Sequence, residues 1–286
     1  MKNFILAARP KTLLAGVLPP LVSYIYFQSV TNTHRIPWVI LCISGALFIQ
    51  LATNFFNDVI DFKKGADAKR VGPTRVSAAG LVDIKTVEFW AWCCVGAAAM
   101  IGIPIILRGG WPFIILGLIS LYLTFGYTGG KVSLAYRGLG ELFVFLFFGL
   151  FSVIGSYYIY AQNIDPRVVT LAAIYGLLAT TFICINNLRD RETDAEVGKK
   201  TLATKMSASS YRLLTLVTIF LPYIFLVHFL SFKMLPIILL ALIPGCVLAS
   251  IAMKKSGADL NLGLKFSGIH MIVFSVLLSG VFLSEY

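Results

Sequence analysis

Charged residues are scarce in this sequence, and the acidic ones are scarcer than the basic ones. Only 13% of the 286 residues are charged while 58% are hydrophobic, and 24 Lys and Arg stand against 13 Asp and Glu. Soluble domains contain about a quarter charged residues, so this composition excludes an ordinary soluble domain. The 22 Phe, 12 Tyr and 4 Trp exclude a disordered chain.

Cysteine and histidine are also rare. The five cysteines all lie within apolar stretches and lack the spacing of a metal site. Five cysteines in a chain of this length also exclude a disulfide scaffold, so they are interpreted as small buried hydrophobic residues. His228 and His270 are isolated in or near apolar stretches, which favours packing over metal ligation.

Long apolar stretches are abundant. A helix crosses the membrane with about 20 apolar residues, and nine stretches are candidates, of which the fourth is short. They are approximately Thr12–Gln28, Ile36–Phe56, Thr86–Leu107, Trp111–Phe125, Leu142–Tyr160, Val168–Ile185, Leu213–Leu230, Met234–Met253 and Lys265–Leu283. No cleavage site follows the first stretch, so we expect it to be retained. The sequence predicts an all-α membrane protein, a single domain over residues 1–286 with nine transmembrane helices in a bundle.

The basic residues are distributed unevenly between the two sides of this nine-span arrangement. With the N-terminus in the cytoplasm, 20 of the 24 Lys and Arg residues fall on the cytoplasmic side. The exceptions are Arg35, Arg108, Arg167 and Lys233. Cytoplasmic loops of membrane proteins are enriched in Lys and Arg, so the pattern predicts a cytoplasmic N-terminus and an external C-terminus. It also explains the net charge of +11 without nucleic acid as a partner.

Eleven of the 13 acidic residues fall on the same side, where several of them are clustered in two similar segments. The second apolar stretch leads into Asn54 and the sequence Asn57-Asp58-Val59-Ile60-Asp61, and the sixth leads into Asn186-Asn187-Leu188-Arg189-Asp190 followed by Asp194. Each segment has an Asn pair, an Asp, a second Asp one helical turn later and then a Gly. The repetition predicts two duplicated halves, roughly residues 1–140 and 141–286, with one acidic segment in each.

The spacing of these acids indicates oxygen ligation of a metal. On a helix, Asp58 and Asp61 share one face, as do Asp190 and Asp194. Hard oxygen ligands without His or Cys suit Mg²⁺, which commonly bridges one or two carboxylates to substrate phosphates. Carboxylates at the edge of an apolar span are costly and usually functional. We therefore interpret the two segments as a clamp for a diphosphate.

A glycine-rich loop lies between the fourth and fifth stretches, on the same side as the acids. Residues 127–141 contain four glycines, which permit tight turns and a close approach of the backbone to a ligand. Lys131 and Arg137 in this loop are candidates to pair with phosphate oxygens. The loop therefore supports the diphosphate interpretation.

These residues resemble the UbiA superfamily of intramembrane aromatic prenyltransferases. That family has an N-D-x-x-D motif after its second helix and a D-x-x-x-D motif after its sixth. Here the motifs read Asn57-Asp58-x-x-Asp61 and Asp190-x-x-x-Asp194. The resemblance extends over essentially the whole chain, including the nine helices and the duplicated halves.

Within the superfamily, three features are similar to the 1,4-dihydroxy-2-naphthoate polyprenyltransferases of menaquinone synthesis. One is Arg9-Pro10-Lys11-Thr12, and another is the continuation of the first motif through Gly65-x-Asp67 to Gly72-Pro73-x-Arg75. The third combines Tyr127-Thr128-Gly129-Gly130 and Tyr136-x-Gly138-Leu139-Gly140-Glu141 with Asn186-Asn187-Leu188-Arg189-Asp190 and Gly198-Lys199-x-Thr201-Leu202. Lys131, where an Arg would fit the pattern better, is a minor departure.

The resemblance implies roles for individual residues. The expected catalytic residues and Mg²⁺ ligands are Asp58, Asp61, Asp190 and Asp194. The expected substrate-binding residues are Asn54, Asn57, Arg9, Lys131, Tyr136, Arg137, Asn187 and Lys199. Among these, Arg9 is the candidate partner of the acceptor's carboxylate.

The resemblance also implies a reaction and a location. The reaction is Mg²⁺-dependent transfer of a polyprenyl group from polyprenyl diphosphate to 1,4-dihydroxy-2-naphthoate, with decarboxylation to demethylmenaquinol. Its expected partners are these two substrates and the lipid bilayer, with neither nucleic acid nor an obligate protein partner. The expected location is the bacterial cytoplasmic (inner) membrane, with the active site on the cytoplasmic face.

Two alternatives remain open at this point. One is a sister prenyltransferase that uses another aromatic acceptor, such as 4-hydroxybenzoate or homogentisate. The other is a secondary transporter, since duplicated halves and intramembrane acids also occur in transporters. Against a transporter, the acids lie at one membrane face and not at the midplane.

Overall fold

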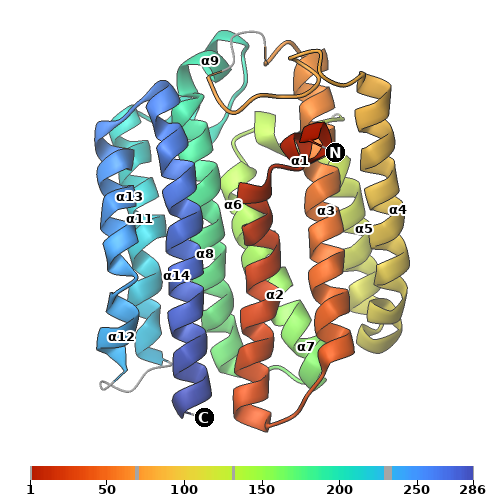
Figure 1. The fold of residues 1–286 in the computed structure, drawn as a ribbon, viewed down its shortest axis with the longest axis vertical. Coiled ribbons are helices and arrows are strands. Elements are labelled where there is room, and N and C mark those ends of the chain that lie inside the picture. Colours follow the sequence, from red (N-terminus) through yellow and green to blue (C-terminus); the bar gives the residue numbers. More distant parts are fainter. Residues whose placement is uncertain (1, 68–70, 131–132, 229–233, 286) are drawn as a thin grey trace.

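The computed structural model describes residues 2–67, 71–130, 133–228 and 234–285, which form a bundle of helices (Figure 1). The long helices are α2 (Pro10–Thr31), α3 (Ile36–Lys63), α4 (Ile84–Gly109), α5 (Trp111–Gly126), α8 (Pro166–Arg189), α11 (Ala208–Phe225), α13 (Leu242–Lys254) and α14 (Asn261–Glu285). One further long segment joins α6 (Gly140–Val144), the π-helix η2 (Phe145–Ile154) and α7 (Gly155–Ala161). The short helices are α1 (Lys2–Ala8), η1 (Leu134–Tyr136), α9 (Arg191–Glu196), α10 (Leu202–Lys205), η3 (Leu226–His228), α12 (Leu235–Leu239) and η4 (Gly257–Leu260).

The prediction of an all-α membrane fold is confirmed. Within the described residues, eight helical segments are long and apolar enough to cross a membrane. The short fourth stretch forms α5, whose 16 residues fall below the length of these eight. Its place beside α3 and α4 is visible in Figure 1. The count of nine spans therefore stays a prediction.

Local sequence determines where several helices begin. Asp83 precedes α4 and its side chain accepts a hydrogen bond from the Lys85 N–H, while Asp165 does the same for Arg167 at the start of α8. Such caps satisfy backbone donors that have no partner within the helix. Gly110 separates α4 from α5 with a φ of 77°, a conformation that favours glycine.

The centre of the bundle is α8, which is buried on most of its surface. Its apolar residues share one buried cluster with residues of α2, α7 and α14, and another with residues of α11 and α13. The π-helix η2 contacts α8 closely through glycine, because a Cβ on Gly149 would lie 2.5 Å from the Ala172 carbonyl oxygen. Small residues allow this backbone approach between helices.

The ends of α3 and α8 that carry the acidic segments lie at the same end of the bundle (Figure 1). The N-terminus is near this end, and the C-terminus is at the opposite end. The functional side chains therefore gather where the two helices meet the connecting loops. The duplicated halves and the cytoplasmic placement of this end stay predictions.

Candidate active site

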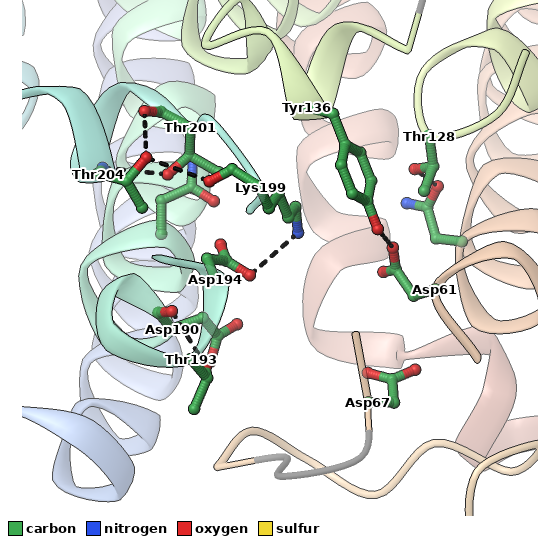
Figure 2. Close-up of polar contacts among 12 residues, drawn as sticks. Asp61, Asp67, Thr128, Tyr136, Asp190, Thr193, Asp194, Lys199, Thr201 and Thr204 are labelled. Carbon is green, nitrogen blue, oxygen red and sulfur yellow. Dashed lines mark hydrogen bonds and ion pairs between the residues drawn. The ribbon is translucent and has the colours of Figure 1, made fainter. Parts of the chain in front are cut away.

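The structure brings the two acidic segments to one site. Asp61 lies in the last turn of α3, whereas Asp190 caps the end of α8 and Asp194 lies on α9. In Figure 2 the two groups approach from opposite sides, with Tyr136 between them. Neither group is enclosed by three ligating side chains, since no cluster of three or more His, Cys, Asp or Glu suited to a metal occurs within the described residues.

The first acidic group consists of Asp61 and Asp67, and a buried arginine holds both. Arg75 donates to Asp61 at 2.8 Å, and its Nε lies 3.6 Å from Asp67. The hydroxyl of Tyr136 also donates to Asp61, at 3.0 Å. Burying a carboxylate is costly unless it is paired and hydrogen-bonded, so Arg75 offsets the cost of burying these two carboxylates.

Asp58 contacts the backbone of the segment that carries Arg75, and not the arginine side chain itself. Its two carboxylate oxygens accept the backbone N–H groups of Val76 and Ser77, at 3.1 and 3.0 Å, and the residue is 1% exposed. These bonds fix the segment that carries Arg75. Asp58 is outside the cavity lining and supports the loop.

The second acidic group is also paired with basic side chains. Arg189 donates to Asp190 at 2.6 Å, and Lys199 lies 3.4 Å from one oxygen of Asp194. The other oxygen of Asp194, Oδ2, is buried without a hydrogen-bond partner among the described residues. Asp194 thus has a carboxylate oxygen available for a ligand.

Burial and neighbouring charges shift the pKa values of Asp194 and Lys199. Burial raises the pKa of the Asp194 carboxyl to about 6, with Lys199 opposing the rise and Asp190 adding to it. Burial alone would lower the pKa of Lys199, but the surrounding Asp61, Asp194 and Asp190 raise it above its ordinary value. Lys199 is therefore cationic at neutral pH, and Asp194 titrates near neutrality.

Tyr136 separates the two groups and is flanked by two lysines. Lys64 Nζ lies 3.8 Å from the centre of the Tyr136 ring and Lys199 Nζ lies 5.2 Å from it. Lys64 also donates to the Thr128 carbonyl at 2.7 Å. Burial raises the pKa of the Tyr136 hydroxyl, and Asp61 adds to this shift, so Tyr136 acts as a neutral donor.

Two asparagines of the first motif fix the local structure. Asn54 donates to the Ala8 carbonyl at 2.8 Å and to the Thr12 hydroxyl at 3.2 Å. The Asn57 side-chain oxygen accepts a hydrogen bond from the Thr128 hydroxyl. Both asparagines line the cavity described below, and they connect α3 to the N-terminal segment and to the glycine-rich loop.

Asn187 depends on a buried glutamate. It donates to Glu141 at 2.8 Å, and the same glutamate oxygen accepts from the Tyr211 hydroxyl. Glu141 is 6% exposed and lies at the start of α6. It therefore fixes the orientation of the Asn187 amide at the cavity wall.

The remaining predicted residues fall into different places. Arg9 lines the cavity and has a left-handed backbone with a φ of 53°, which is strained for a residue other than glycine. Arg137 is exposed and outside the cavity lining, and its carbonyl accepts from Lys205 at 2.6 Å. Lys131 lies outside the described residues.

The two acidic groups border a cavity of about 230 Å³. Its polar wall includes Arg9, Asn57, Asp61, Asn187, Asp190 and Lys199. A second cavity of about 360 Å³ is almost entirely apolar and is lined by α3, α4, α5 and η2. The two cavities share five lining residues, which makes them neighbours along one path: Ile49, Gln50, Ser120, Phe147 and Phe148.

The site also contains four residues that were not predicted from the sequence as site residues: Lys64, Asp67, Arg75 and Glu141. Asp67, Arg75 and Glu141 are part of the motifs quoted above, but their partners depend on the path of two loops. Lys64 directly follows α3 and has no signal that separates it from the other basic loop residues. Contacts between distant segments supplied these four assignments.

The sequence matches a known family and several characterised relatives. The profile of the UbiA prenyltransferase family matches residues 16–263. The 1,4-dihydroxy-2-naphthoate octaprenyltransferase of Haemophilus influenzae is 34% identical over 214 residues, which cover 70% of this chain and 68% of that protein. An octaprenyltransferase of the same name from Mycobacterium leprae is 28% identical over 97% of this chain and 95% of that protein.

Solved structures share the fold at low sequence identity. A UbiA homologue from Archaeoglobus fulgidus bound to GPP and Mg²⁺ matches with a TM-score of 0.65 and 15% identity, over 99% of both chains. The apo structure of a UbiA homologue from Aeropyrum pernix matches with a TM-score of 0.68 and 12% identity, over 93% of this chain and 96% of that one. The family profile and the sequence relatives, together with the eight apolar spans within the described residues, identify a multi-pass membrane enzyme. The chain belongs to the UbiA prenyltransferase family.

Proposed function

We propose that this prenyltransferase transfers a polyprenyl group from polyprenyl diphosphate to 1,4-dihydroxy-2-naphthoate, with loss of CO₂, and so forms demethylmenaquinol. The names of several bacterial relatives support this acceptor. The observation that carries the proposal is the pair of acidic groups bordering a polar cavity that adjoins an apolar one. This arrangement suits a substrate with a charged head and a long hydrocarbon tail.

The diphosphate would bind between the two acidic groups with Mg²⁺. Asp61 and Asp67 on one side and Asp190 and Asp194 on the other offer the oxygen ligands that Mg²⁺ prefers. The buried Oδ2 of Asp194, without a hydrogen-bond partner among the described residues, supports this fit. When bound, Mg²⁺ neutralises charge that develops on the leaving diphosphate.

The chain's own residues have distinct tasks in this proposal. Lys199 and Arg75 lie at the cavity wall and would donate to phosphate oxygens, each by exchanging a carboxylate partner for the substrate. Tyr136, kept neutral, holds Asp61 in place. Asp58 holds the loop that carries Arg75, which differs from the ligand role that the motif predicts for it.

The acceptor would lie in the polar cavity with its carboxylate towards Arg9. Three arginines among the described residues line the cavity. Two of them, Arg75 and Arg189, are paired with acids of the diphosphate site, so Arg9 is the one assigned to the acceptor, whose two carboxylate oxygens match its planar fork. Asn54 and Thr12 line the same wall and fix the chain beside Arg9. The donor's tail would occupy the apolar cavity, away from water.

The bonds and electron pairs of the proposed reaction balance between the donor and the acceptor, without a further reactant. The bond between the prenyl carbon and the diphosphate oxygen breaks, and both electrons leave with the oxygen. A ring carbon of the naphthoate supplies the electron pair of the new carbon–carbon bond. The carboxylate departs as CO₂ and returns its electron pair to the ring, which restores aromaticity.

The acceptor is tested by comparing several aromatic acids in one membrane preparation. Membranes that contain the protein are incubated with one polyprenyl diphosphate, Mg²⁺ and either 1,4-dihydroxy-2-naphthoate, 4-hydroxybenzoate or homogentisate. We expect prenylated product and CO₂ from the naphthoate alone. Product from another acid in its place would assign the protein to a sister activity.

Two further experiments test the requirement for a metal ion and the alternative of a transporter. EDTA is expected to stop product formation, and added Mg²⁺ to restore it, whereas chelator-insensitive turnover would contradict the metal clamp. Proteoliposomes that accumulate a solute without forming any prenylated product would favour a transporter.

A further inference from the structure

The junction between the two cavities contains two aromatic residues. Of the five residues that line both cavities, Ile49 and Gln50 belong to α3 and Ser120 belongs to α5, while Phe147 and Phe148 belong to the π-helix η2. A donor with its diphosphate in the polar cavity and its tail in the apolar one would pass through this junction, with its reacting carbon, which is bonded to the diphosphate, on the polar side of it.

The π-helix explains how one helix lines both cavities. Along residues 143–159 the cavity-lining positions recur at four-residue intervals: 143, 144, 147, 148, 151, 152, 155, 156 and 159. A four-residue repeat drifts around an α-helix, which has 3.6 residues per turn. The wider turn of a π-helix rotates the repeat in the opposite sense, so the mixed segment keeps one face towards the cavities.

This register builds a column of aromatic rings along the path. The rings of Phe143 and Phe147 are stacked, with centres 6.0 Å apart and planes 12° apart. Phe151 continues the column with an edge contact, its centre 5.1 Å from that of Phe147. Phe143 lines only the polar cavity and Phe151 only the apolar one, so Phe147 is the ring at the boundary.

We propose that Phe147 and Phe148 are catalytic residues that stabilise the positive charge on the prenyl group as its bond to diphosphate breaks, and that they keep water away from it. The proposal rests on the proposed function. The negative face of an aromatic ring attracts a cation, most strongly where water is excluded. The other three residues of the junction, Ile49, Gln50 and Ser120, carry no charge, so the two rings provide most of the electron-rich surface there.

The proposal predicts a competition between two fates of one cation. After the carbon–oxygen bond breaks, the allylic cation forms a carbon–carbon bond with the acceptor ring. If water reaches it first, a carbon–oxygen bond forms to give polyprenol, and a proton is released. The fraction of donor converted to polyprenol therefore reports how well the junction protects the cation.

The first test replaces each ring with an aliphatic side chain. Phe147→Leu and Phe148→Leu are each expected to lower kcat by about 30-fold and to raise the polyprenol fraction. Phe148→Tyr, which keeps the ring, is expected to retain most of the turnover. Wild-type kcat together with a wild-type polyprenol fraction in both Leu variants would overturn the proposal.

Two matched substitutions separate catalysis from packing. Phe151→Leu removes a ring that lines only the apolar cavity, and it is expected to raise KM for the donor without changing the polyprenol fraction. Phe89→Leu alters a ring on α4 that is 66% exposed and outside both cavity linings, and it is expected to behave as wild type. An equal rise in polyprenol for Phe151→Leu and Phe148→Leu would contradict a special role for the junction.

A fluorine series isolates the electrostatic part. Phenylalanines with one, two and three ring fluorines, incorporated at position 148, keep the shape of the ring but weaken its negative face. The proposal expects kcat to fall stepwise with each fluorine, whereas a flat series would overturn it. If the wild-type chain prenylates no acceptor at all, the proposed function fails, and this inference fails with it; variant effects with an active wild type address this inference alone.

Discussion

Asp61 and Asp190 lie on opposite sides of the cavity, and each is paired with an arginine in the structure. We expect Asp61→Asn and Asp190→Asn each to lower kcat by about 100-fold or more, because each change removes a charge at the proposed diphosphate site. The measurement is prenyl transfer in isolated membranes. Asp259→Asn, an exposed acid on η4, is the control and should leave transfer unchanged. Full turnover in both site variants would refute the clamp.

Protonation of Asp194 predicts a pH dependence of the metal requirement. Its pKa of about 6 means that the carboxylate loses its charge as the pH falls through 6, and a protonated acid is a poor Mg²⁺ ligand. We expect the Mg²⁺ concentration for half-maximal turnover to be constant above pH 7 and to rise about tenfold per pH unit below 6. Asp194→Asn should remove this slope. A half-maximal concentration that does not vary from pH 5 to 8 would contradict the assignment.

In the segment after α3, Asp58 fixes the backbone next to Arg75, and Arg75 in turn pairs with Asp61. Asp58 holds the backbone of Val76 and Ser77, and the same segment carries Arg75 to Asp61. We expect Asp58→Ala to lower both the melting temperature and the turnover, while Asp58→Asn, which keeps one acceptor oxygen, retains part of each. Melting in detergent and prenyl transfer are the two measurements. Turnover lost without any change in melting temperature would indicate direct ligation by Asp58.

The close contact between η2 and α8 depends on a glycine, and replacing that glycine is expected to lower the free energy of unfolding. A Cβ on Gly149 would meet the backbone of Ala172 and Gly176, so Gly149→Ala must push the two helices apart. We expect a loss of about 1–3 kcal/mol in the free energy of unfolding, measured as a lower melting temperature in detergent. Gly96→Ala on α4 is the matched control, since its Cβ would meet nothing within 4 Å. Equal melting temperatures in the two variants would refute the tight contact.

The long helices were predictable from the sequence because they are long apolar runs with polar or proline boundaries, whereas short helices such as α9 have no such run. The acidic segments at the ends of α3 and α8 were also predictable from their spacing. The different partners of Asp58 and Asp61 were not, because helical spacing puts both acids on one face, while the loop that returns to them brings a guanidinium to Asp61 and only backbone N–H groups to Asp58. The π-helix was equally hidden, since a uniformly apolar run such as residues 145–154 has no polar face to reveal its period.

At the scale of the whole molecule, the membrane orientation is the main prediction. In a background with Cys93→Ala and Cys246→Ala, a membrane-impermeant maleimide should label Gln162→Cys, between α7 and α8, in intact cells. It should label Lys200→Cys, beside the active site, only after the membrane is opened. This follows from the excess of basic residues on the active-site side. The reverse labelling pattern would place the active site outside the cell.

The ion pairs between acidic and basic residues of the site have a consequence for substrate entry. Arg75, Arg189 and Lys199 act as built-in counter-ions, so the acids next to them are already neutralised before any substrate arrives. A donor that brings both phosphates and metal ions supplies a new partner for each side of every pair at once. Binding then exchanges one ionic partner for another and leaves no buried charge unpaired. We therefore expect the donor and the metal to bind together and not one after the other.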